Sequence, residues 1–180
     1  MIQKTLVLIK PDAMERGLAG EIIARIERAG LKMVDCKMVQ ADEKLASTHY
    51  PVTNGWLTKV GSNTISDCEK YDVDVKAIMG TDDPLRIGKK VHEWNMKFIL
   101  SAPVLAIIFE GVHVIEAVRK LCGPTLPLLA SPGTIRGDFS SASAISENAK
   151  GMPIRNLIHA SGDEKEAKRE IKLWFPEEHE

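Results

Sequence analysis

A histidine with small neighbours stands in the segment NLIHASGD, residues 156–163. His159 follows an apolar pair and precedes Ala160 and Ser161, so little bulk surrounds its ring. A neutral imidazole keeps a lone pair on one nitrogen and can act as a nucleophile. The segment has two interpretations: an ordinary loop histidine, or a nucleophile placed where an anion binds.

The residues that follow predict a helix whose N-terminus lies close to His159. Asp163 with Glu166 three positions later fits a capping pair, and Ser161 with Glu164 fits the same pattern. Both starts place His159 near free backbone N–H groups and positive partial charge, which favour a bound anion.

Glu170 is the candidate carboxylate for orienting the imidazole. Counted from an Asp163 cap, it lies about two turns along the helix, roughly 10 Å away. It reaches His159 only if the helix folds back beside the preceding strand.

Two arginines lie in a region rich in proline and glycine, residues 119–139. Arg136 belongs to the stretch GTIRGD, where the flanking glycines allow a tight turn and a close approach to a ligand. Its planar guanidinium suits bidentate binding of phosphate, and Thr125 adds a hydroxyl donor. Taken alone, Arg119 also fits an ordinary surface residue of a helix.

Lys10 ends the first predicted strand, immediately before Pro11. A lysine at this position is usually a solvated strand end. The functional alternative is a cation held at the edge of the sheet for a phosphate group.

The other histidines carry weaker signals. His49 and His113 fit ordinary helix residues, His92 lies in an irregular connection, and His179 lies in the acidic tail. Neither histidines nor carboxylates show metal-ligand spacing, so the sequence predicts no protein-held metal. GTIRGD lacks the lysine pattern of a P-loop.

Bulk properties limit the classes of protein. The chain has 180 residues and a net charge of −1, which gives no electrostatic case for a nucleic-acid or membrane partner. Its longest apolar run, residues 102–109, is far shorter than the ~20 residues of a membrane span. The three cysteines show no CxxC pairing, and the N-terminal segment lacks the features of a secretory signal. We expect a cytoplasmic enzyme or binding domain.

The elements that position these residues follow from periodicity and end signals. Strands are expected at residues 5–9, 31–39, 102–111 and 153–159, and helices at 20–30, 42–50, 112–123 and 163–174. The order is that of a ferredoxin-like, split βαβ sandwich of the α+β class: a four-stranded antiparallel sheet with two helices covering one face.

Two long connections interrupt this order within a single domain spanning residues 1–180. Residues 51–97 carry scattered glycine, asparagine, aspartate and proline; a stretch that begins among them, 82–99, fits a helix. Its inward residues would be Leu85, Val91, Trp94 and Phe98. Residues 140–154 are small and polar. Connections of this length usually carry function or assembly contacts.

Taken together, the segments LVLIKPDA, HY, EGVHVIEAVRKLCGPTLPLLASPGTIRGDF and RNLIHASGDEKEAKREIKLWF resemble the nucleoside diphosphate kinase family. The match runs in order along the chain with two interruptions, at the long connections. PGTIRGDF and the N-x-x-H-x-S segment are specific as a set.

The resemblance implies a ping-pong transfer of the γ-phosphoryl group from a nucleoside triphosphate to a nucleoside diphosphate, with broad base tolerance. His159 would be the phosphorylated nucleophile, supported by Ser161 and Glu170. Mg²⁺ would arrive with the nucleotide phosphates, and the chain would form a homo-oligomer, a hexamer or a tetramer. The positions matching the family's nucleotide contacts are Lys10 and Asn156 near the ribose, Arg119 and Thr125 at the β-phosphate, Arg136 at the transferring group, and Tyr50.

The chain departs from the family pattern at several points. Gly162 stands where the family usually has an acid, which would weaken an indirect contact with the metal unless Asp163 compensates. The aromatic base clamp comes from the first long connection, where Val91, His92 and Trp94 are the candidates. Both connections are longer than usual and lie near the base slot.

Two other functions fit parts of the pattern. One is a nucleotide-binding regulatory protein of the same fold with weak transfer, which Gly162 and the long connections favour. The other is a ferredoxin-like module for nucleic acid or protein, which the near-neutral charge and the lack of aromatic sheet motifs disfavour.

Overall fold

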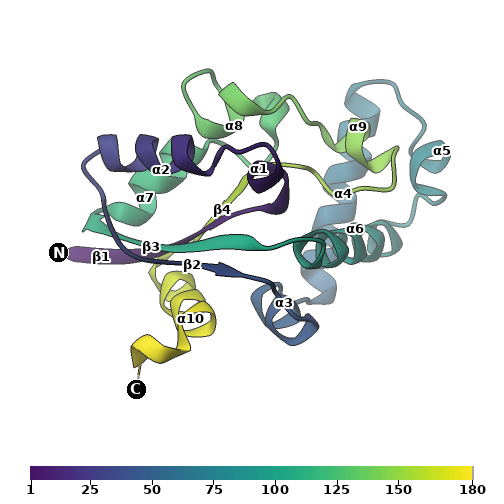
Figure 1. Ribbon diagram of the computed structural model, residues 1–180. Coiled ribbons are helices and arrows are strands. Elements are labelled where there is room, and N and C mark those ends of the chain that lie inside the picture. The colour runs from purple at the N-terminus through teal and green to yellow at the C-terminus, as the bar shows by residue number, and fades with distance from the viewer. Residues whose placement is uncertain (180) are drawn as a thin grey trace.

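The computed structural model describes residues 1–179 and has an antiparallel sheet at its centre (Figure 1). Its four strands lie in the order β2-β3-β1-β4. They are β1 (Ile2–Ile9), β2 (Lys32–Val39), β3 (Val104–Val112) and β4 (Ile158–Ala160). Because β1 and β3 pair along their whole lengths, they form the centre of the sheet. The predicted α+β fold, with its four-stranded antiparallel sheet, is confirmed.

Helices cover both faces of this sheet (Figure 1). We predicted cover on one face only, where α2 (Ala19–Arg28) and α7 (Val114–Cys122) lie. The opposite face is covered by α3 (Glu43–His49) and α10 (Glu164–Trp174). The remaining elements are α1 (Pro11–Glu15), α4 (Asn54–Lys70), α5 (Val75–Met79), α6 (Pro84–Leu100), η1 (Pro127–Leu129), α8 (Ile135–Phe139), α9 (Ala144–Asn148) and η2 (Pro176–His179). None of the described helices combines the length and apolar character needed to cross a bilayer.

The alternation of side chains along β1 explains why both faces need cover. Val7 and Ile9 pack in the core shared with α2 and α7, whereas Leu6 and Leu8 pack in the core shared with α3 and α10. All four side chains are fully buried. Since successive residues of a strand point to opposite faces, a continuous apolar run requires an apolar layer on each side.

The first long connection folds into a hairpin of two long helices, α4 and α6. Their backbones approach closely: a Cβ atom on Gly61 would lie 1.8 Å from the carbonyl oxygen of Pro84, and one on Gly88 would lie 2.0 Å from that of Leu57. Thr53 caps α4 by accepting a hydrogen bond from Trp56 N. The prediction missed α4 because its packing face contains Gly61 and Thr64, which weaken the apolar period.

Helix α6 was predicted, but its inward face was only partly right. Asp83 caps it by accepting a hydrogen bond from Arg86 N. Val91 is buried as expected, whereas Leu85, Trp94 and Phe98 are half-buried. The buried positions are Ile87, Gly88, Val91 and Ile99. Helix α6 packs against both α4 and α3. Its buried surface is therefore wider than the single apolar stripe that we predicted, and it is centred on other residues.

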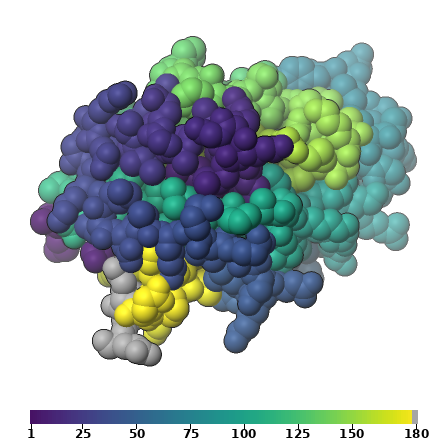
Figure 2. All heavy atoms as spheres, in the orientation of Figure 1, coloured from purple at the N-terminus to yellow at the C-terminus, as the bar shows by residue number. Residues whose placement is uncertain are grey.

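The second long connection contains α9, which begins with a capping box between Ser143 and Ser146. It contacts the α4 and α5 helices. In the space-filling view, the yellow-green residues of this segment pack beside the teal residues of the hairpin (Figure 2). The two long connections therefore meet at one end of the molecule.

Strand β4 is shorter than predicted, because residues 153–157 do not join the ladder. Leu157 has a φ of +68°, an uncommon conformation for a residue with a Cβ atom. Its N–H donates to the carboxylate of Asp12 at 3.0 Å, and its carbonyl accepts from Lys10 N at 2.9 Å. This turn takes Asn156 out of the strand, and its buried side chain bonds to Lys10 and to the carbonyl oxygen of Thr125 instead.

Candidate active site

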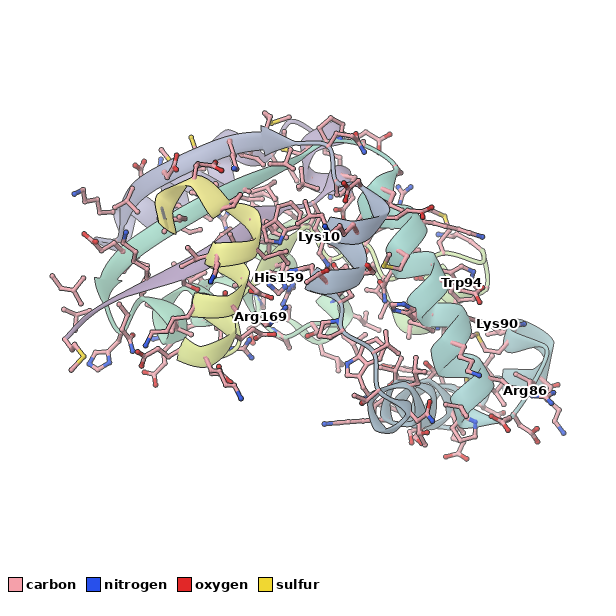
Figure 3. All side chains as sticks on the ribbon, turned by 90° about the horizontal axis from the view of Figure 1, so that it is seen from below. Lys10, Arg86, Lys90, Trp94, His159 and Arg169 are labelled. Carbon is pink, nitrogen blue, oxygen red and sulfur yellow. The ribbon has the colours of Figure 1, made fainter. Side chains whose placement is uncertain are left out.

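A cleft of about 720 Å³ opens where the ends of β1 and β4 meet the loops after α3 and α7. All the predicted site residues line it except Ser161, which lies directly behind Glu170. Figure 3 shows Lys10 and His159 close together beside the yellow α10 helix, with Trp94 farther away on α6. The residues lining the cleft that were predicted from sequence are Lys10, Tyr50, Arg119, Thr125, Arg136, Asn156, His159 and Glu170.

His159 is held in one orientation by Glu170. It lies in β4, and its Nε2 atom is 2.9 Å from Glu170 Oε2. A carboxylate only accepts hydrogen bonds, so Nε2 carries the hydrogen and Nδ1 keeps its lone pair. Burial and the positive charges of Lys10 and Arg136 lower the pKa of His159 to about 3. The ring is therefore neutral at physiological pH, which a nitrogen nucleophile requires.

Glu170 reaches His159 because α10 folds back against the sheet. Asp163 caps this helix by accepting a hydrogen bond from Glu166 N at 2.8 Å, so the first of the two predicted starts is correct. Ser161 serves another purpose: its hydroxyl donates to Glu170 Oε2 at 2.7 Å. Burial raises the pKa of Glu170. The hydroxyl of Ser161 and the imidazole of His159 hydrogen-bond to the carboxylate and hold it in place.

His49 belongs to the same cluster, which corrects the prediction that it is an ordinary helix residue. It is 3% exposed, and its ring meets that of His159 edge to face at a centroid distance of 4.6 Å. Trp174 Nε1 donates to His49 Nδ1 at 3.2 Å. His49 Nδ1 also lies 3.5 Å from Glu170 Oε1. Burial lowers the pKa of His49 to about 3. The sequence signal was the spacing of three residues from apolar Ala46, which places His49 on the same face of α3.

The donor atoms of His49, His159 and Glu170 all lie within 4.8 Å of one another, as metal ligands do. Sequence spacing gave no sign of this grouping because the three residues come from α3, β4 and α10. His159 and Glu170 are hydrogen-bonded to each other, and Ser161 donates to Glu170 as well. His49 Nδ1 accepts from Trp174, whereas His49 Nε2 has no hydrogen-bond partner among the described residues.

Arg136 fixes the turn that precedes His159. Its guanidinium donates to the carbonyl oxygens of Asn156 at 3.0 Å, Gly123 at 2.7 Å and Ile158 at 2.6 Å. It thus binds the chain on both sides of the unusual Leu157 conformation. These bonds use one N–H group of each guanidinium nitrogen. Each of the two terminal nitrogens keeps a second N–H group, which can donate a hydrogen bond to a phosphate oxygen.

The glycines around Arg136 act differently from one another. Gly133 has a φ of +89° and makes the predicted turn. A Cβ atom on Gly137 would lie 2.1 Å from the carbonyl oxygen of Ser131, so the close approach there is to the protein's own loop rather than to a ligand. Thr134 caps α8, the helix that carries Arg136, by accepting a hydrogen bond from Gly137 N at 3.1 Å.

Lys10 is buried, which excludes the solvated strand end considered from sequence. Its ammonium donates to Asn156 Oδ1 at 2.7 Å, and Asn156 Nδ2 donates to the carbonyl oxygen of Thr125 at 3.0 Å. Burial, and to a lesser degree Arg136, lowers the pKa of Lys10 to about 8. The side chain is therefore still a cation at neutral pH and faces the cleft.

The remaining predicted contacts are more open to solvent. Arg119, in the last turn of α7, and Thr125 are exposed and line the cleft. Tyr50 is half-buried, packs edge to face on His49, and has a pKa raised by burial.

Glu166 places a carboxylate beside Gly162, the position where we expected an acid from the family pattern. Its carboxylate accepts a hydrogen bond from Gly162 N and lines the cleft together with Arg119. Asp163, which we had considered for this purpose, is used as the cap of α10. The signal in the sequence was the capping pattern itself, which places Glu166 in the first helical turn.

A second cavity of about 430 Å³ adjoins the cleft. The three residues that we considered for the base clamp differ in whether they line it. Val91 lines it, and so does Trp56, which sequence reasoning missed. His92 is half-buried, with its ring 6.2 Å from that of Trp56. Trp94 lines a different cavity, beside Pro11 and Lys97, so it does not face the site.

The fold and cleft define a class: an α+β domain with a half-buried neutral histidine, a carboxylate that orients it, and cationic side chains that line the same cleft. A sequence profile described as Nucleoside diphosphate kinase matches residues 3–57 and 85–179. The unmatched residues 58–84 contain most of α4 and all of α5.

Individual proteins agree with this match. The chain is 43% identical over 177 residues to a nucleoside diphosphate kinase of Pyrobaculum aerophilum, covering 98% of this chain and 97% of that protein. A relative of the same name from Borreliella burgdorferi is 45% identical, with 97% of this chain and 88% of that protein covered.

Solved structures are similar as well. An NDP kinase from Pyrobaculum aerophilum superposes with a TM-score of 0.91 at 42% identity, covering 99% of this chain and 98% of that one. A transition-state mimic of the Borrelia burgdorferi nucleoside-diphosphate kinase, with bound vanadate and ADP, superposes with a TM-score of 0.75 at 44% identity. The match covers 97% of this chain and 87% of that one. The chain belongs to the nucleoside diphosphate kinase family, and its activity is phosphoryl transfer between nucleotides.

Proposed function

We propose that His159 carries the phosphoryl group between a nucleoside triphosphate and a nucleoside diphosphate. The observation that carries this proposal is the 2.9 Å bond from Nε2 to Glu170, which leaves Nδ1 as the unprotonated nitrogen. Nδ1 attacks the γ-phosphorus, the bond from γ-phosphorus to the bridging oxygen breaks, and the diphosphate leaves. A terminal oxygen of the second diphosphate then attacks the phosphohistidine, and the P–N bond breaks.

The surrounding residues position the phosphates and balance charge. Phosphoryl transfer needs in-line geometry and neutralised charge more than acid or base help. Arg119 and Thr125 take the β-phosphate, Arg136 meets the transferring group, and Lys10 with Asn156 takes the ribose. Forming the N–P bond places positive charge on the ring, and the carboxylate of Glu170 stabilises it.

Mg²⁺ enters with the nucleotide in this proposal. The cleft is lined by Lys10, Arg119 and Arg136, so it favours the anionic phosphates rather than a free cation. Mg²⁺ keeps several waters and binds through one or two carboxylates plus substrate phosphates. Glu166, which lines the cleft, fits that need and would hold the ion. When bound, the ion neutralises charge on the phosphates.

The cellular setting follows from the same class of enzyme. We expect the whole chain to act as one domain, in the cytoplasm and within a homo-oligomer, either a hexamer or a tetramer. Leu128 and Leu129 are 48% and 53% exposed, and they line a shallow pocket together with Tyr71. An apolar group of this kind is typical of a subunit contact.

Labelling with γ-labelled ATP tests the proposed nucleophile. Wild-type protein should acquire label that is lost in acid and kept in base, and addition of a diphosphate should remove it as labelled triphosphate. His159→Ala should acquire none. Labelling of this variant to the same extent as the wild type would refute the proposal. Normal nucleotide affinity with negligible transfer in the wild type would instead favour the regulatory protein considered above.

A further inference from the structure

The carboxylate of Glu170 has a second oxygen, and a single donor among the described residues bonds to it. The side chain is 1% exposed, so each oxygen needs a partner within the protein. Oε2 accepts from His159 and from a serine hydroxyl. His49 Nδ1 lies 3.5 Å from Oε1 but does not donate to it, because this nitrogen already accepts from Trp174. The donor to Oε1 is Arg169, whose Nη2 atom lies 3.4 Å away.

The same guanidinium joins α10 to the end of α3. Its Nη1 atom donates to the carbonyl oxygen of Thr48 at 3.0 Å. Since α3 ends at His49, this carbonyl belongs to the last turn, where carbonyl groups have no partner within the helix. The bond therefore connects the helix that carries Glu170 to the helix end that carries His49 and Tyr50.

Arg169 also lies between two acids of its own helix. Glu166 and Glu170 are four residues apart on α10, a spacing at which like charges repel. Arg169 Nη2 is 3.9 Å from Glu166 Oε1 and 3.4 Å from Glu170 Oε1. The Arg169 and Glu166 side chains are each 38% exposed, so solvent weakens their attraction. We therefore expect the larger effect of Arg169 on the buried carboxylate of Glu170.

Arg169 stands outside the group of cations that line the cleft. That group consists of Lys10, Arg119 and Arg136. Figure 3 shows Arg169 on α10, near His159. Its bonds go to a backbone carbonyl and to two carboxylates of the protein. It therefore acts on the reaction through Glu170 and not by binding the nucleotide.

We propose that Arg169 is a positioning residue for phosphoryl transfer, an inference that rests on the proposed role of His159. By donating to Oε1 it keeps Glu170 ionised and directed at His159 Nε2, and its bond to Thr48 holds α10 in place. Forming the N–P bond puts positive charge on the ring, which the ionised form of Glu170 offsets. Arg169 therefore favours the transfer step and leaves nucleotide binding unchanged.

The first test measures single-turnover labelling of His159 from γ-labelled ATP, together with KM for ADP. Arg169→Met removes the charge and keeps an unbranched stem. We expect it to slow labelling about three- to tenfold, the size of one partly exposed bond to a charged group, with KM unchanged. Arg169→Lys restores the charge and should recover most of the rate. Lys168→Met removes a cation of the same helix that pairs with Glu164, so it should match wild type.

The pH dependence of the labelling rate separates positioning from a purely structural role. Burial raises the pKa of Glu170, and the guanidinium of Arg169 lowers it. Without Arg169 this pKa rises further, so Glu170 takes up a proton and loses its charge at a higher pH. The acid limb of the profile should therefore move to higher pH in Arg169→Met and stay in place in Arg169→Lys and Lys168→Met.

Other ionisable groups around Glu170 are the same in all these variants, so they do not shift the limb between them. They are His159 from β4, His49 and Tyr50 from the end of α3, Lys10 from the end of β1, and Asp163 and Glu166 from α10.

Each outcome decides the question. A labelling rate of Arg169→Met within about twofold of wild type, or an acid limb that stays in place, would overturn the proposal. A lowered melting temperature with an unmoved limb would show that Arg169 only joins the two helices. A raised KM at an unchanged labelling rate would assign Arg169 to the nucleotide instead. Labelling of wild-type His159 is measured first, so failure of the proposed function is recognised separately.

Discussion

The carboxylate of Glu170 matters to the reaction more than to the fold, and Glu170→Gln separates the two. An amide oxygen still accepts the hydrogen bond from His159 Nε2, now 2.9 Å from Oε2, so the neutral ring stays in place. The substitution removes the negative charge of Glu170, and this loss matters only when positive charge develops on the His159 ring during transfer. Two unit charges about 4 Å apart interact by about 4 kcal/mol at an effective dielectric constant of about 20.

The expected slowing follows from that interaction. With half to all of the charge developed, the substitution costs about 2–4 kcal/mol in the transition state. Each 1.36 kcal/mol corresponds to a factor of ten, so transfer should slow by about 30-fold to 10³-fold. Stability should not fall, since burial raises the pKa of Glu170 and so makes its charge unfavourable in the folded state.

Rapid-quench measurement of phosphoenzyme formation from γ-labelled ATP gives the rate directly. Thermal unfolding of the same protein supplies the second readout. Glu164→Gln is the matched control: this residue lies on the same helix but is exposed and pairs with Lys168, so its rate should equal that of wild type. A rate for Glu170→Gln within about threefold of wild type would refute the assigned role.

Two further predictions concern Lys10 and the helical hairpin. Because the pKa of Lys10 is lowered to about 8, the side chain loses its charge as the pH rises through that value. KM for ADP should therefore rise up to about tenfold from about pH 7 to about pH 9.5, and a flat profile would contradict the assignment. Gly88→Ala places a methyl group 2.0 Å from the carbonyl oxygen of Leu57 and should lower the free energy of unfolding by about 1–3 kcal/mol in urea titrations. Gly20→Ala, with open space around it in α2, should be neutral or stabilising, and equal effects at the two sites would disprove the close-contact argument.

The local elements could largely be predicted because their signals lie within a few residues of one another. The period of two predicted β2, and Asp163, one of the two predicted starts, caps α10. Helix α4 was missed since glycine and threonine form part of its packing face, and packing of that kind depends on a partner helix. Strand β4 was predicted too long because the φ of Leu157 is set by its contacts with Asp12 and Lys10.

The sequence by itself determined the chemistry available to this protein: a histidine among small residues, cations for phosphate, and an ordered set of motifs that identifies the family. Only the tertiary structure decided which groups meet. It brought Glu170 to His159, added His49, placed the carboxylate of Glu166 beside Gly162, and left Trp94 outside the site. The physical reason is that these contacts join elements distant in the chain. Their distances depend on how helices pack on the sheet, and spacing along the sequence does not specify that packing.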